Sequence, residues 1–74
     1  MIGGFKMLNK QSFYRKTILI KWRHEIGKTV ESTFGTGTIE GVGFNDNNEF
    51  QIEIRRSGDT RNIIIKDTDI FNIL

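Results

Sequence analysis

The fold is decided by one stretch, which runs FGTGTIEGVGF (34–44), NDNN (45–48), EFQIEIRR (49–56), SGD (57–59) and TRNIIIK (60–66). Three of these segments are rich in β-branched and aromatic residues, and two short sets of turn-forming residues separate them. The pattern predicts a three-stranded antiparallel meander with two hairpins. Four glycines in 34–44, and a change of apolar phase between Ile39 and Val42, indicate a bulged and strongly curved first strand.

Alternation assigns faces to the other two strands of the meander. Phe50, Ile52 and Ile54 alternate with polar residues, so they are expected to face the core. In the next strand Ile63 and Ile65 share one face, and Ile64 lies on the other, either exposed or in contact with another copy. Residues 67–69 are expected to form a single helical turn, and residues 70–74 a short closing strand.

Upstream of the meander, residues 14–23 also alternate, with Ile18, Ile20 and Trp22 on one face. This period of two predicts a first strand, with Trp22 in the core. Residues 24–33 leave two interpretations open: a long irregular loop, or the first half of a long, bent second strand. Residues 1–12 are expected to be an N-terminal extension or a helical turn, and residues 13–74 the folded domain.

Length and composition bound the function. A chain of 74 residues forms one small domain, which buries only ~60% of its unfolded surface. It has no cysteine and a single histidine, which excludes a disulfide framework and leaves zinc without its usual ligands. We therefore expect no catalytic site, cofactor or metal. With no secretory signal and no apolar run near ~20 residues, we expect a cytoplasmic protein that binds no membrane.

The predicted order of elements resembles the Src-homology-three-like small β-barrels, including KOW-type and plasmid-borne variants. The resemblance covers Thr17 to Leu74 and depends on Gly37–Gly41, on the hairpin at Ser57–Asp59 and on Ile65–Ile73. It implies an all-β, five-stranded barrel and says almost nothing about activity.

A weaker resemblance is to Sm-like barrels of the bacterial RNA-chaperone type, in which a curved strand with a Gly-Thr-Ile-x-Gly element also leads to a short closing strand. The residues before Thr17 would then stand where that family has its helix. The family's basic-aromatic-histidine motif for uridine is absent, and its counterpart, Ile65–Asp69, carries two aspartates. A ring-forming RNA chaperone is therefore a minor alternative.

Basic residues suggest a partner. The chain carries a net charge of +2, and its cations gather in the N-terminal third and around the hairpin at 57–59. A surface of this kind binds phosphates through counterion release. We expect DNA or RNA to be bound by Lys16, Lys21, Arg23, Arg55, Arg56 and Arg61.

The competing hypothesis is a protein-interaction module that recruits or inhibits a larger protein, as many proteins of mobile elements do. Open strand edges invite strand addition, and Leu19, Ile64 and Phe71 are candidates for an apolar interface. Self-association into a homo-oligomer would serve either function, because it would enlarge a small core.

Overall fold

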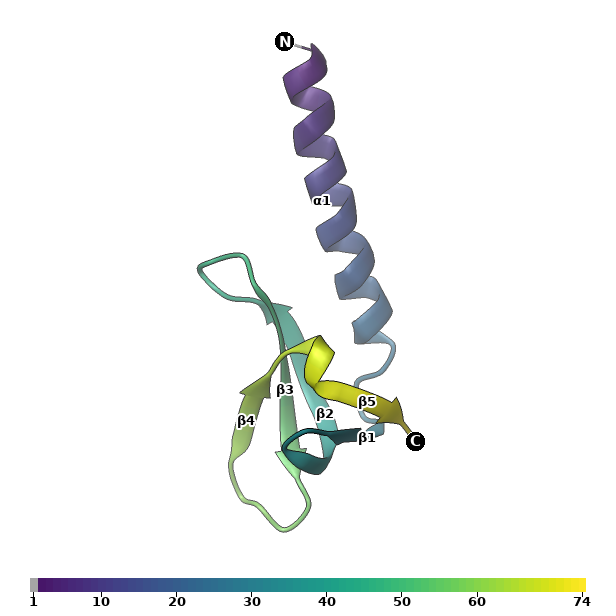
Figure 1. Ribbon diagram of the computed structural model, residues 1–74, viewed down its shortest axis with the longest axis vertical. Helices are drawn as coiled ribbons and strands as arrows, with labels where there is room; N and C mark the ends of the chain where they lie inside the picture. The colour runs from purple at the N-terminus through teal and green to yellow at the C-terminus, as the bar shows by residue number, and fades with distance from the viewer. Residues whose placement is uncertain (1) are drawn as a thin grey trace.

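The structure, a computed structural model, describes residues 2–74, with side chains from Phe13 onward. The chain runs in the order α1 (Ile2–Arg23), β1 (Thr29–Ser32), β2 (Gly35–Phe44), β3 (Phe50–Arg56), β4 (Asn62–Ile65), the 3-10 helix η1 (Asp67–Asp69) and β5 (Ile70–Ile73). The strands form one antiparallel sheet in the order β4-β3-β2-β1-β5, which makes β4 and β5 its edges. The chain is thus mostly β, with one long helix that rises beyond the sheet (Figure 1).

The strand predicted over residues 14–23 is wrong, because these residues form the C-terminal turns of α1. Ile18 and Trp22 are four residues apart and share a face in a strand and in a helix alike, so either structure directs both inward. Ile20 separates the two alternatives: a strand would place it beside them, whereas the helix turns it outward, and it is 45% exposed. The core position predicted for Trp22 is confirmed, since its side chain is 8% exposed.

β1 resolves the ambiguity over residues 24–33. Residues 29–32 form a separate strand, paired with β2 on one side and β5 on the other. A tight turn joins it to β2, in which the Ser32 hydroxyl donates to the Gly35 oxygen at 2.8 Å and accepts from the Phe34 N–H at 3.1 Å. Gly35 takes a φ of 107°, which residues with a Cβ rarely adopt. The sheet therefore has five strands as predicted, but its first strand is β1 and not the strand predicted over residues 14–23.

The meander is confirmed in β2, β3 and β4. The Asn45 carboxamide oxygen accepts the N–H groups of Asn47 and Glu49, both at 2.9 Å, and thereby closes the β2–β3 turn. The expected bulge appears as a register shift between Ile39 and Gly41. η1 and β5 follow β4 as predicted.

The core lies between one face of the sheet and the C-terminal part of α1. Alternation along β3 directs Ile52 and Ile54 into this core, as predicted, and Ile65 of β4 joins them while Ile64 is exposed. The buried apolar side chains are Trp22, Val30, Ile39, Ile52, Ile54 and Ile65. Ile18, Val42, Phe50, Ile63 and Ile70 pack against them.

Candidate nucleic-acid interface

Charge is segregated between α1 and the rest of the chain. Of the eleven Lys and Arg residues, six lie in α1 and five after it, whereas all nine Asp and Glu residues follow the helix. The helix therefore carries a formal charge of +6 and the sheet with its turns −4. This separation is far stronger than the net charge of +2 indicates, and it makes α1 the strongest attractor for an anion.

Three residues predicted to contact nucleic acid, Lys16, Lys21 and Arg23, lie on α1, and all three are exposed. Lys16 and Arg23 are seven residues apart, so they share one face of the helix, and Lys21 lies on another side. Among the side chains from Phe13 onward, no ion pair involves these three cations. Their charge is therefore available to a ligand.

The other three, Arg55, Arg56 and Arg61, gather around the β3–β4 turn, where two of them are already paired. Arg55 Nη2 lies 3.0 Å from Glu40 Oε1, and Arg56 Nε lies 2.8 Å from Asp59 Oδ2. Arg61 is exposed. The β3–β4 turn lies at the opposite end of the molecule from the N-terminal end of α1 (Figure 1). The six residues therefore form two groups, and the helix group has the unpaired charge.

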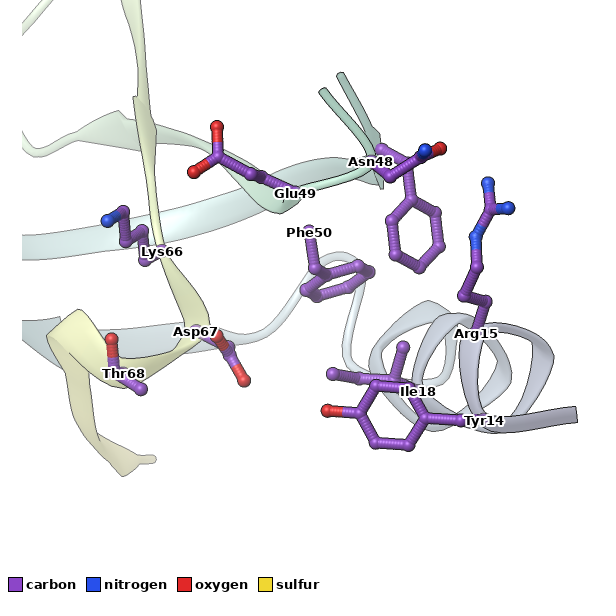
Figure 2. Close-up of a pocket in the computed structure, with 10 residues that line it drawn as sticks. Tyr14, Arg15, Ile18, Asn48, Glu49, Phe50, Lys66, Asp67 and Thr68 are labelled. Atoms are coloured by element: carbon purple, nitrogen blue, oxygen red, sulfur yellow. The ribbon is translucent and has the colours of Figure 1, made fainter. Parts of the chain in front are cut away.

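An open groove of about 730 Å³ lies between α1, the β2–β3 turn and the segment that enters η1. Ile18 and Tyr14 of the helix face Phe50 across it, and Asp67 stands at the far side of the opening (Figure 2). The full lining comprises Tyr14, Arg15, Ile18, Phe44, Asn48, Glu49, Phe50, Lys66, Asp67 and Thr68. This volume falls within the range of ordinary small-ligand sites, roughly 300–1,000 Å³.

The floor of the groove is aromatic. Phe44 and Phe50 pack edge to face, with ring centroids 5.2 Å apart. The Arg15 guanidinium lies 4.9 Å from the centroid of the Phe44 ring, in a cation–π contact between the helix and β2. Arg15 of the helix therefore lies beside the aromatic surface that Phe44 and Phe50 form, so a positive charge and aromatic rings occur together at this site.

Sequence reasoning did not find this groove. The signal was present in Tyr14 and Ile18, which are four residues apart and share one helical face. This signal is specific only if residues 14–23 are assigned to a helix. In a strand, Tyr14 and Ile18 would also share a face, but Lys16 would lie between them on that face.

Two other features, a metal-binding cluster and a membrane-spanning helix, are not found among the described residues. No group of three or more His, Cys, Asp or Glu side chains among them is arranged to hold a metal ion. No helix among them is both long enough and apolar enough to cross a lipid bilayer. No family model, curated protein or solved structure compared with the chain matches it.

Proposed function

We propose that this protein is a non-enzymatic nucleic-acid-binding module built on a Src-homology-three-like small barrel, with α1 as its phosphate-binding element. The observation that carries the proposal is the segregation of six cations and no carboxylate in α1. The strand order β4-β3-β2-β1-β5, with a 3-10 turn before β5, supports the barrel class. The fold by itself names no ligand.

The physical basis of binding is counterion release. Each phosphate that a Lys or Arg side chain neutralises frees condensed cations, so affinity falls steeply as salt rises. Exposed, unpaired side chains such as Lys16 and Arg23 can approach phosphates without first breaking an ion pair. The net negative charge of the sheet repels the same polyanion, which favours an orientation with α1 toward the nucleic acid. Arg55 and Arg56 would have to leave Glu40 and Asp59 in order to contribute fully.

The experiment compares two double variants that remove equal positive charge. Lys16→Ala/Arg23→Ala should weaken binding to DNA and RNA of any sequence and reduce the slope of log K against log salt by about 1.4 on single strands. Arg55→Ala/Arg56→Ala should change the slope less, because those guanidinium groups are already ion-paired. Fluorescence anisotropy across a salt series measures both slopes.

The outcomes are decisive. Equal slopes for the two double variants would show that the β3–β4 turn contributes as much as α1, and would reject α1 as the main phosphate-binding element. Absence of binding by the parent protein at low salt would reject nucleic-acid binding altogether.

The alternative function, a protein-interaction module, is favoured by exposed apolar side chains on both α1 and the β5 edge. Phe13 is 72% exposed on the helix, and Phe71 and Leu74 are comparably exposed at the other end of the chain. Ile64 on the β4 edge is also exposed, whereas Leu19 is half-buried. Large exposed apolar side chains at unpaired sheet edges are typical of surfaces that receive another polypeptide.

A further inference from the structure

The groove beside α1 offers flat aromatic surface at a place that solvent reaches. Tyr14 is 65% exposed, and its ring lies across the opening from Phe50, with Ile18 between them (Figure 2). Bases of single-stranded nucleic acids stack on aromatic side chains of this kind, because every base presents a π-face. A base within a duplex is stacked on its neighbours and cannot enter such a groove.

Cations border the same aromatic surface. Arg15 lies over Phe44 at the helix side, and Lys66 lines the groove at the β4 side. No ion pair involves either cation among the described side chains. A nucleotide whose base occupies the groove would therefore have positive charge near its phosphates on both sides, continuous on one side with the cations of α1.

A half-buried carboxylate adds selectivity. Asp67 lines the groove, and Figure 2 shows its side chain directed toward the space beside Tyr14 and Phe50. None of the side-chain hydrogen bonds in the described part of the chain involves this carboxylate, whereas Asp69 nearby accepts the Lys66 N–H at 2.9 Å. An ionised carboxylate only accepts hydrogen bonds, so Asp67 is complementary to a ligand that presents donors.

We propose that this groove holds one unpaired base of a single-stranded nucleic acid and prefers guanine to thymine or uracil, an inference that rests on the proposed function. Guanine presents two adjacent N–H donors, on N1 and N2, which match the two oxygens of Asp67. Thymine and uracil present a single N–H between two carbonyl oxygens, and those oxygens repel the carboxylate. Stacking on the exposed ring of Tyr14 supplies affinity for any base, and Asp67 supplies the preference.

The test uses fluorescein-labelled oligothymidylate with and without one central guanine, measured by anisotropy at fixed low salt. The parent protein should bind the guanine-containing strand about tenfold more tightly, as one bidentate contact to a base edge provides, and pairing that strand with its complement should abolish the difference. Asp67→Asn should bring the ratio of the two affinities close to one. The ratio is the proper readout, because loss of a negative charge raises affinity for every polyanion.

Tyr14→Ala should weaken binding of both single strands by about 5- to 150-fold, the range of one base–aromatic stack. Phe13→Ala is the matched control: Phe13 is the next residue on the same helix, it is more exposed than Tyr14, and it does not line the groove. Circular dichroism of each variant verifies folding, which neither exposed aromatic nor Asp67 is expected to determine.

The two levels of proposal fail differently. If the parent binds single strands without preference, or if Tyr14→Ala and Asp67→Asn leave affinity and ratio unchanged, the groove is not a base site, and phosphate binding by α1 stands. If the parent binds neither strand, the proposed function fails and the base site fails with it.

Discussion

Gly37 shows how one residue position determines the close approach of two strands, β2 and β3. It lies in the middle of the sheet, opposite Val30 on β1 and Arg56 on β3. A Cβ at this position would lie 2.9 Å from the backbone oxygen of Arg55, a distance that real side chains do not reach. The backbone of β3 therefore comes nearer to β2 here than any other residue type permits.

We expect Gly37→Ala to destabilise the protein by about 1–3 kcal/mol, because the added methyl forces two hydrogen-bonded backbones apart. Gly43→Ala is the control in the same strand: its Cβ would meet no atom within 4 Å, so the expected change is within about 0.5 kcal/mol. Urea denaturation followed by circular dichroism measures both. Equal losses of stability would show that the close approach to Arg55 is unimportant.

α1 is the element in which the structure differs from the sequence-based prediction. Its C-terminal part packs on the core through Ile18 and Trp22, and Gly27, at a φ of 93°, reverses the chain after the helix ends. Tertiary packing, more than a strong amphipathic pattern, therefore places this helix. The same docking brings Tyr14 and Arg15 to the groove, so the candidate base site depends on the helical register of residues 14–22.

Two isoleucine variants distinguish the helix from the predicted strand. Ile18→Ala removes a side chain packed against the core and should cost about 1–3 kcal/mol, less than a fully buried isoleucine. Ile20→Ala removes a side chain that points outward and should change stability by less than about 0.5 kcal/mol. Denaturant titration compares the two. Similar costs would contradict the helix, because only a strand puts both side chains on the core face.

The whole molecule is elongated and electrically asymmetric. Its principal extents are 52 × 23 × 17 Å, and a helix of charge +6 occupies one end while the sheet, of charge −4, occupies the other. An anionic partner should therefore approach from the helix end. A protein partner that recognised the apolar β5 edge would approach from elsewhere and would depend less on salt.

A purification from cell extract, performed with and without nuclease, separates these partners. Bound material should absorb strongly at 260 nm, and nuclease or high salt should release it. The Lys16→Ala/Arg23→Ala variant is the control and should retain less nucleic acid. A protein that stays bound to both the parent and this variant after nuclease treatment would favour the protein-interaction module.

Much of the sheet could be predicted, and the reason is local. Phe50, Ile52 and Ile54 alternate with polar residues, and the adjoining turns carry residues that close hairpins through their own side chains, as Asn45 does. The helix over residues 14–23 could not be predicted, because the spacing of Ile18 and Trp22 suits a helix and a strand equally. Thr29–Ser32 is short, and its pairing with β5, far along the chain, has no local signal.

The amino-acid sequence by itself determined the meander, the bulge in β2, the turn before the last strand and the total charge, because each of these depends on neighbouring residues or on composition. Three features became apparent only in the tertiary structure. Residues 14–23 are helical, and Tyr14 lies across a groove from Phe50 and Asp67. Arg55 and Arg56 are paired with Glu40 and Asp59. Except for the short-range pair of Arg56 with Asp59, these features depend on contacts between residues distant in the chain. They form only when burial of Trp22 against the sheet fixes the position of the helix.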